Sequence, residues 1–388
     1  MSFDINIYSK YSYVLAKFNI LVTKGELDIM KMCLRWFGTG YDSVALWQIR
    51  QIPGVKGVIT TLYGQKAGDE WPVEEIRRMK KEVEDSGLSI YGIESVNIVD
   101  EIKTGHVSRD KYIEKYINTI QNLSNEGIHM VCYNFMSIFD WTRSDLAKVR
   151  PDGSTVLAYD QRIINTIVPS QMFKRLNGES NGFILPGWEP ERLARVEELF
   201  EMYNNIDNEK MFQNIKYFLG AIMPTCEKYG VKMAIHIDDP VWSVFGLPRI
   251  VKGKEDALRI INAVPSDYNG ITLCTGSLSS SPKNDIPDII RALKGKIHFA
   301  HVRNTKHDDI EGVFEESAHL SSDGSLDMYE IIKTFDEIGF DGPVRPDHGR
   351  AIWGEKAMPG YGLYDRALGS QYLLGLIEAV KKQRIMLR

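Results

Sequence analysis

The chain has 388 residues, of which 43% are hydrophobic and 26% charged, a composition typical of globular proteins and unlike that of disordered chains. Its 47 lysines and arginines against 52 acidic residues give a net charge of −5, which offers no support for a nucleic-acid-binding surface, and no apolar run approaches the roughly 18 residues of a membrane-spanning helix. The four cysteines lie far apart without a C-x-x-C pair, so we expect free thiols in a cytoplasmic protein that has no nucleic-acid or membrane partner.

The first 29 residues differ from the rest of the chain. They are weakly amphipathic, lack the pattern of a secretory signal, and precede a second methionine, Met30. We expect residues 1–29 to be an N-terminal extension without a part in the chemistry, and residues 30–388 to form a single catalytic domain.

From Met30 onward, short β-rich runs alternate with amphipathic segments. Several runs, such as GVITTLY and VKMAIHI, are almost continuously apolar, which is typical of parallel strands covered on both faces. The expected strands are Leu34–Phe37, Lys56–Leu62, Ser89–Glu94, His129–Phe135, Val231–His236, Gly270–Cys274, Ile297–Val302 and Pro343–Asp347. This alternation predicts an α/β fold, the (β/α)8 TIM barrel. The alternative, a doubly wound open sheet, would need a glycine-rich phosphate-binding turn, and neither G-x-G-x-x-G nor G-x-x-x-x-G-K-[ST] is present.

The helices between the strands carry recognisable ends. Pro72 is expected at the first position of one helix that ends at Gly87, and Ser108 is expected to cap another. A third helix is expected to end before Gly339. Each has apolar residues at helical spacing, which predicts one face packed against the barrel.

A long segment, about residues 137–208, separates the fourth strand from the fifth. We expect a helical and loop insertion there. An insertion after a strand lies at the C-terminal face of a barrel, where active sites are built, so it is expected to cover the substrate. A dimerisation arm is the alternative, and one insertion can serve both purposes.

Residues of metal-binding types end the last four expected strands. They are His236, Cys274, His301 and Asp347, each about one βα unit after the previous one. Neighbouring barrel strands lie about 4.8 Å apart, so inward-facing side chains at one level converge. Two imidazoles, a thiolate and a carboxylate predict one divalent transition metal. Zinc suits this set by affinity, whereas a chelating substrate needs open coordination positions, which favour Mn²⁺, Fe²⁺ or Co²⁺.

Three further carboxylates have two interpretations each. Asp238 and Asp239 follow His236 closely and either orient its imidazole or cap the following turn. Glu94, at the end of the third strand, either binds a sugar hydroxyl or caps the next helix.

Several segments together resemble the mannonate dehydratase family. They are H-x-D-D-P at His236–Pro240, FGLPRI at Phe245–Ile250, CTGS at Cys274–Ser277, HVRN at His301–Asn304, RPDHGR at Arg345–Arg350 and PGY at Pro359–Tyr361, with RWFG near the start and FDWTRSDL in the insertion. They occur in the family's order, from about Arg35 to the C-terminus. Ile237 stands where the family commonly has proline, and residues 1–29 have no counterpart in it.

The resemblance implies a xylose-isomerase-like barrel and a hydro-lyase that converts D-mannonate to 2-keto-3-deoxy-D-gluconate in hexuronate breakdown. It places the metal ligands on His236, Cys274, His301 and Asp347. It also implies one divalent metal per subunit, Mn²⁺ or Fe²⁺, and a homo-oligomer, either a dimer or a tetramer.

The same resemblance places the acid and base on His348 and Tyr361. Removal of the C2 proton adds negative charge to the substrate carboxylate, which a metal can stabilise, and the C3 hydroxyl needs a proton as it leaves. The sequence does not decide which of the two residues performs which transfer.

Arginine suits carboxylates, so Arg303 and Arg350, together with Asn304, are the expected substrate-binding residues. Arg345 shares inward parity with Asp347, and for this residue a structural ion pair inside the barrel is at least as good an interpretation.

Three alternatives to the dehydratase remain. The same barrel supports metal-dependent sugar isomerases and epimerases, but their ligands are mostly glutamates and aspartates. A carbohydrate-binding barrel without catalysis would not need His348 and Tyr361. A zinc phosphoesterase or endonuclease would call for more histidines and a basic cleft, and the net charge of −5 does not favour one.

Overall fold

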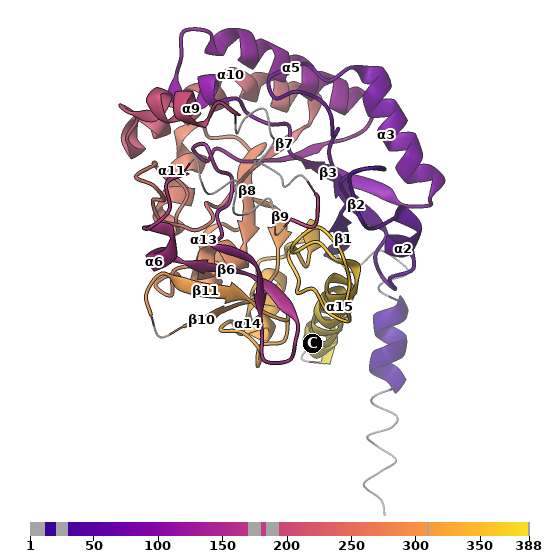
Figure 1. The fold of residues 1–388 in the computed structure, drawn as a ribbon. Helices are drawn as coiled ribbons and strands as arrows, with labels where there is room; N and C mark the ends of the chain where they lie inside the picture. Colours follow the sequence, from indigo (N-terminus) through magenta and orange to yellow (C-terminus); the bar gives the residue numbers. More distant parts are fainter. Residues whose placement is uncertain (1–11, 21–29, 170–179, 184–193, 309, 387–388) are drawn as a thin grey trace, which may run out of the picture.

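The computed structural model describes residues 12–20, 30–169, 180–183, 194–308 and 310–386, and its centre is a closed barrel of parallel strands (Figure 1). The barrel closes because Met32 of the first strand pairs with Val344 of the last. Its strands, in order around the barrel, are β1 (Lys31–Arg35), β2 (Gly57–Thr60), β3 (Ser89–Glu94), β4 (Met130–Tyr133), β7 (Lys232–His236), β8 (Asn269–Cys274), β9 (Ile297–His301) and β12 (Pro343–Arg345). The predicted TIM barrel and its eight strands are therefore confirmed, although the first strand begins and ends a few residues before the predicted range.

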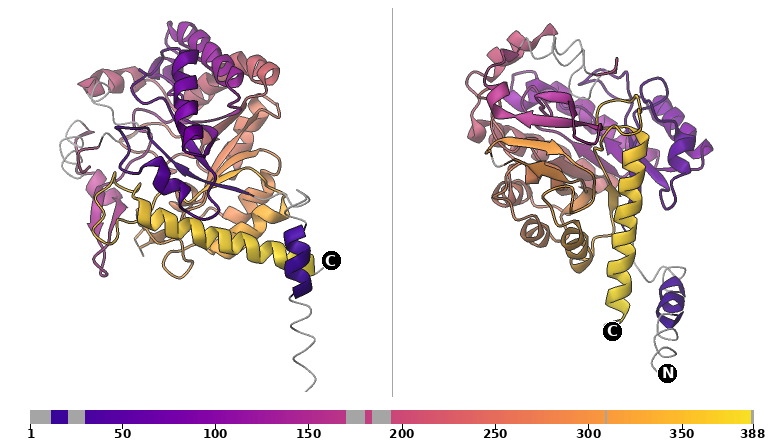
Figure 2. Two further views of the ribbon diagram at one scale, coloured as in Figure 1. Left: turned by 90° about the vertical axis from the view of Figure 1, so that its right-hand side faces the viewer. Right: turned by 60° about the horizontal axis from the view of Figure 1, so that its bottom comes forward.

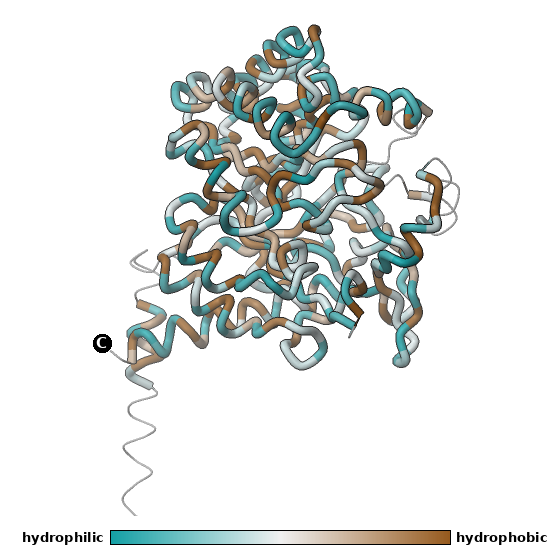
Figure 3. Tube along the Cα trace, turned by 90° about the vertical axis from the view of Figure 1, so that its left-hand side faces the viewer, coloured by the Kyte–Doolittle hydropathy of each residue, from teal (hydrophilic) through white to brown (hydrophobic). Residues whose placement is uncertain are grey.

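Helices surround the barrel and bury one face each. They are α2 (Leu46–Arg50), α3 (Val73–Asp85), α4 (Asp100–Thr104), α5 (Arg109–Asn125), α10 (Asn208–Tyr229), α11 (Lys254–Ala263), α12 (Thr275–Ser279), α13 (Ile286–Ala292), α14 (Met328–Glu337) and α15 (Leu363–Met386). Hydrophobic and hydrophilic residues alternate along the outer helices (Figure 3), as expected when one face of each helix is buried.

Helix ends differ from their predicted caps in detail. Pro72 is the N-cap of α3 rather than its first helical residue, and Gly87 follows the helix with φ 74°, a left-handed conformation that glycine adopts without strain. Ser108 is the N-cap of α5, but its side chain makes no capping hydrogen bond. Asp327 caps α14 by accepting a hydrogen bond from the Glu330 N–H.

Apolar side chains fill the lower part of the barrel. Phe299, Met130, Ile59 and Ala234 belong to this internal cluster. The Phe299 ring lies edge-on beneath His301, with ring centres 4.5 Å apart. Polar side chains at the carboxyl ends of the strands are thus supported from below by a packed core.

A second sheet lies outside the barrel, beside the carboxyl ends of its strands. Its antiparallel order is β10-β11-β6-β5, in which the insertion supplies β5 (Asp145–Val149) and β6 (Thr155–Asp160) and the segment after β9 supplies β10 (Thr305–His307) and β11 (Val313–Glu316). The insertion also contains α6 (Gln161–Ile164) and α9 (Val196–Tyr203). The expected helical and loop insertion therefore also contains a β-hairpin, which the sequence analysis missed. Residues 170–179 and 184–193 of the insertion lie outside the described residues.

Residues 12–20 form a helix outside the barrel, beside the end of α15 (Figure 2). The Lys382 ammonium of α15 lies 5.3 Å from the centre of the Phe18 ring. The rest of residues 1–29 lies outside the described part of the chain, and their independence from the chemistry stays a prediction. Among the helices of the described residues, none has both the length and the apolar character that crossing a membrane requires.

Candidate metal centre and active site

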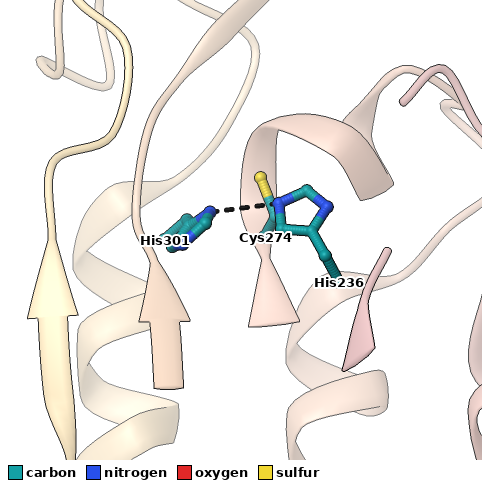
Figure 4. A group of neighbouring side chains, drawn as sticks. All are labelled: His236, Cys274 and His301. Atoms are coloured by element: carbon teal, nitrogen blue, oxygen red, sulfur yellow. Dashed lines mark hydrogen bonds between the residues drawn. The ribbon is translucent and has the colours of Figure 1, made fainter. Parts of the chain in front are cut away.

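Three side chains of metal-binding types meet at the carboxyl ends of neighbouring strands. His236 is the last residue of β7, Cys274 of β8 and His301 of β9. Their donor atoms all lie within 4.8 Å of one another, and His236 Nε2 is 3.1 Å from His301 Nδ1 (Figure 4). Cys274 and His301 are fully buried, whereas His236 reaches the adjoining cavity.

Asp347 lies beside two of these three residues. Its Oδ2 atom is 3.7 Å from His301 Nδ1 and 3.8 Å from Cys274 Sγ. It follows β12 by two residues and has φ 58°, a left-handed conformation that is costly for a residue with a side chain and is tolerated where the surroundings enforce it. Arg345 and Arg303 hold the carboxylate at 2.7 Å and 2.8 Å, and despite burial they keep the pKa of Asp347 well below its usual range.

The donor set fits a divalent transition metal. Metal bonds to imidazole are about 2.0–2.1 Å long, so two nitrogens bound to one ion at about 90–109° lie about 2.8–3.4 Å apart. The 3.1 Å separation of His236 Nε2 and His301 Nδ1 falls in this interval. Glu94, Cys132 and His301 form a second such group. It is a poorer site because burial raises the pKa of the Cys132 thiol far above its usual value, and a thiol binds metal as the thiolate.

His348 and Tyr361 form a hydrogen-bonded pair next to the metal-binding group. His348 Nε2 and the Tyr361 hydroxyl are 2.9 Å apart, and the rings meet edge to face. His348 Nδ1 lies 3.4 Å from Glu316 Oε1. Burial and the nearby Asp347 carboxylate raise the pKa of Tyr361, so the phenol retains its proton.

A buried ionic network surrounds the pair. Arg143 contacts Asp239 and Glu316, both at 2.8 Å, and Arg303 contacts the same two carboxylates at 2.7 Å and 2.5 Å. Burial disfavours charge on both acids, but the two guanidiniums hold the pKa of Asp239 well below its usual range, and Arg303, His348 and Arg143 lower that of Glu316 to about 2. Glu316 ends β11 and Arg143 precedes β5, so the network joins the second sheet to the barrel.

The three expected substrate-binding residues, Arg303, Asn304 and Arg350, are not among the residues that line the cavity, and their role in substrate binding stays a prediction. Arg303 is turned into the ionic network. The Asn304 amide donates to the Leu320 carbonyl at 3.0 Å and accepts from the Leu326 N–H, so it holds a loop. Arg350 pairs with Asp365 and Asp152 away from the site. In each case the polar end of the side chain contacts other residues of the protein.

The open interpretations of the neighbouring acids are now resolved. Asp238 accepts hydrogen bonds from the Ile250 and Val251 N–H groups, so it fixes the following chain, and Asp239 pairs with arginines. Neither contacts the His236 ring, whose Nδ1 lies 2.5 Å from the Ile237 carbonyl oxygen.

Arg345 forms ion pairs inside the barrel, as predicted from its place two residues before Asp347. Its Nη2 atom lies 2.9 Å from Glu94 Oε1 and 2.7 Å from Asp347 Oδ1. Glu94 therefore pairs with Arg345 and does not cap the next helix.

A cavity of about 660 Å³ opens above these residues. The insertion contributes to its wall, which agrees with the expected cover over the substrate. The polar and aromatic residues around the cavity include Arg35, Glu94, Lys103, Asn134, Asp140, Trp141, Arg195, His236, Asp239, Arg345, Asp347, His348 and Tyr361. Sequence reasoning missed Arg35, the last residue of β1, although it occupies the same strand-end position as the metal-binding residues.

Comparison with known proteins gives a consistent result. The family model of D-mannonate dehydratase matches residues 30–386. The chain is 69% identical over 353 residues to the mannonate dehydratase of Brachyspira hyodysenteriae, covering 91% of this chain and 99% of that protein. It is 54% identical over 357 residues to the mannonate dehydratase of Thermotoga maritima, covering 92% and 99%.

Solved structures agree with these matches. The crystal structure of mannonate dehydratase from Streptococcus suis serotype 2 is similar with a TM-score of 0.82 and 42% identity, covering 92% of this chain and 95% of that one. D-psicose 3-epimerase from Clostridium cellulolyticum, at 10% identity and a TM-score of 0.53, shares the fold alone.

Proposed function

The chain belongs to the mannonate dehydratase family and is a hydro-lyase that removes water from D-mannonate, and from this premise we propose which residues perform the reaction. One observation carries the proposal. A metal-binding group and a hydrogen-bonded His–Tyr pair adjoin one cavity, because His236, Asp347, His348 and Tyr361 all line it.

The family is metal-dependent, and we assign the ion to His236, Cys274, His301 and Asp347, with one Mn²⁺ or Fe²⁺ in each chain. The 3.1 Å spacing of the two imidazole nitrogens and the low pKa of Asp347 support this set. When bound, such an ion acts as a Lewis acid and stabilises the charge that grows on the substrate carboxylate. Mn²⁺ and Fe²⁺ accept five or six ligands, which leaves positions for a chelating acid.

His348 and Tyr361 divide the two proton transfers. The raised pKa of Tyr361 keeps its phenol protonated, so the hydroxyl is suited to donate to the departing C3 hydroxyl group. The His348 imidazole is then left to accept the C2 proton at Nε2. The ketone forms when the resulting enol gains a proton at C3 and its C2 hydroxyl releases a proton. Glu316, 3.4 Å from Nδ1, favours the tautomer that carries hydrogen on Nδ1, so that Nε2 has a lone pair, which accepts from the Tyr361 hydroxyl until substrate binds.

Arg303 is a positioning residue in this scheme. Its Nε atom lies 2.8 Å from Asp347 Oδ2, and its two terminal nitrogens bind Asp239 and Glu316. It thereby fixes both a metal-binding carboxylate and the acid beside His348.

We also propose that the chain forms a homo-oligomer, a dimer or a tetramer, and acts in the cytoplasm. Trp47 and Trp353 are 60% and 74% exposed beside one shallow apolar groove, a surface that a subunit contact would cover. All four cysteines are free thiols, which suits a reducing compartment. Light scattering of the purified chain tests the oligomeric mass.

Solvent deuterium exchange tests the division of roles. In Tyr361→Phe we expect exchange of the C2 hydrogen without loss of water, while dehydration falls about 10²- to 10⁴-fold. In His348→Ala both exchange and dehydration should disappear while the metal content stays at wild-type level. Tyr329→Phe removes an exposed hydroxyl bonded to Gln383, away from the cavity, and is the matched control. Exchange that survives in His348→Ala would contradict the assignment of the base.

Metal analysis tests the ligand set. Cys274→Ser should lower the bound metal and the activity together, whereas Cys226→Ser, which changes a buried thiol of α10, should leave the metal content unchanged. Full metal content in Cys274→Ser would remove this thiolate from the set.

A further inference from the structure

Arg35 is a buried cation with no close ion pair among the described residues, although its charge acts at longer range on the Asp42 and Glu94 carboxylates and favours their ionised forms by lowering the pKa of each. It ends β1, is 4% exposed, and lines the cavity. Its guanidinium forms no hydrogen bond and no ion pair with any described residue, and its Nη1 atom is buried without a partner. The guanidinium carbon lies over the face of the Phe37 ring, 4.6 Å from its centre. Burying a charge without a partner is costly, so this arrangement calls for an explanation.

Each of the other buried arginines of the described residues has an ion pair or several carbonyl acceptors, although Arg143, Arg150, Arg249, Arg303 and Arg345 also keep guanidinium nitrogens without a hydrogen bond. Arg143, Arg303 and Arg345 each contact at least two carboxylates. Arg366, close to Arg35 in the fold, donates to the carbonyls of Arg35, Tyr361 and Gly362. A guanidinium with neither an ion pair nor a hydrogen bond therefore sets Arg35 apart from the other buried arginines of the described residues.

Because Arg35 lines the cavity, an anion that enters the cavity would supply the close partner that the chain does not. Arg35 lies on the strand that pairs with β12, whose end carries Arg345 and Asp347. The positive charge of Arg35 acts on Tyr361. Burial and the Asp347 carboxylate raise the pKa of Tyr361, and the smaller effect of Arg35 lowers it. An anion at Arg35 would thus lie on the side of the cavity next to the reacting groups.

We propose that Arg35 binds the carboxylate of the substrate and sets the preference of the enzyme for sugar acids over uncharged sugars. This inference rests on the proposed function. A carboxylate has two oxygens that each accept more than one interaction, so it can meet a guanidinium and a metal ion together. Arg345 also lines the cavity, but it is less suited to this role than Arg35, because Glu94 and Asp347 already balance its charge.

The experiment compares the acid with its uncharged amide. The metal-loaded wild type, Arg35→Met and Arg35→Lys are assayed for KM and kcat with D-mannonate, and for competitive inhibition by D-mannonamide. In Arg35→Met we expect KM for the acid to rise at least about tenfold, because a charged hydrogen bond is lost, while the inhibition constant of the amide changes little. Arg35→Lys should recover part of the preference, since it retains the charge but loses the planar fork.

Thermal stability separates ligand binding from a structural role. Without substrate, Arg35→Met should melt at or above the wild-type temperature, because an uncompensated buried charge is removed. The stabilisation by added D-mannonate should shrink in the same variant. Arg77→Met, which breaks an exposed ion pair with Glu126, controls for the loss of an arginine.

Two outcomes would overturn the inference. One is an unchanged ratio of acid to amide binding in Arg35→Met. The other is a lower melting temperature with equal weakening of acid and amide, which would make Arg35 structural. The proposed function fails separately, through the deuterium-exchange and metal results for His348→Ala and Cys274→Ser, which do not involve Arg35.

Discussion

Charges are buried on two sides of the cavity, and the protein compensates them differently. Beside β9 and β11, Arg303 meets Asp239, Glu316 and Asp347 within 2.8 Å. At the end of β1, Arg35 meets no carboxylate of the described residues within ion-pair distance. The two arginines are buried to a similar degree, so burial alone does not reveal their roles. A charge balanced by the chain itself holds the architecture in place, whereas an unbalanced one facing a cavity is available to a ligand.

The largest expected effect separates these two arginines by stability. Arg303→Met leaves three buried carboxylates with one cation fewer, and we expect it to lower the free energy of unfolding by about 3–5 kcal/mol. Urea denaturation followed by circular dichroism measures the change. Arg35→Met is the matched substitution at a site without an ion pair. Equal losses in both variants would mean that the distinction between the two sides is wrong.

A smaller effect depends on pH and concerns Glu316. Burial opposes its ionisation, but Arg303, His348 and Arg143 lower its pKa from 4.5 to about 2 in the folded protein. A depressed pKa stabilises the fold above pH 4.5, and this stabilisation is lost as the pH falls toward 2. At neutral pH, Glu316→Gln should therefore be less stable than the wild type by about 1–3 kcal/mol.

The pH series makes the expectation for Glu316 specific. Unfolding by urea is measured for the metal-loaded wild type and Glu316→Gln at steps from pH 7 downward. The two free energies of unfolding should converge below pH 4.5. A difference that stays constant with pH would show that the ionised form of Glu316 is not what stabilises this side.

The smallest effect is expected at the surface. Arg77 and Glu126 lie 2.7 Å apart, but the Arg77 side chain is 61% exposed, so solvent screens the pair. Arg77→Ala should change the free energy of unfolding by less than about 1 kcal/mol in the same urea assay. A loss comparable to that of Arg303→Met would mean that burial does not control the strength of ion pairs in this protein.

Local patterns were sufficient to predict the barrel and the meeting of three side chains that could bind a metal. His236, Cys274 and His301 each end a strand whose apolar run is visible in the sequence, and parallel strands bring such ends to one edge. The position of Asp347 is less regular, because its left-handed backbone turns the side chain after β12 has ended.

The sequence did not predict contacts between residues that lie far apart along the chain. Phe314 pairs with Tyr159 across the second sheet, and nothing near either residue identifies the other. The same limit explains Arg303, whose orientation depends on Glu316 and Asp239, and Asn304, whose amide is used by a loop further along the chain. Arg35 was missed because the first strand was expected to continue beyond it.

The second sheet has a consequence for how this protein is made on the ribosome. Its hairpin, β5 and β6, leaves the exit tunnel well before β11, the strand that completes it. Until then Arg143 has no Glu316 to contact, and Tyr159 has no neighbouring strand on that side. Such late pairing of distant segments slows folding and leaves a strand edge open to aggregation. A nascent chain released before about residue 316 would expose this edge, and it is here that we expect a chaperone to act.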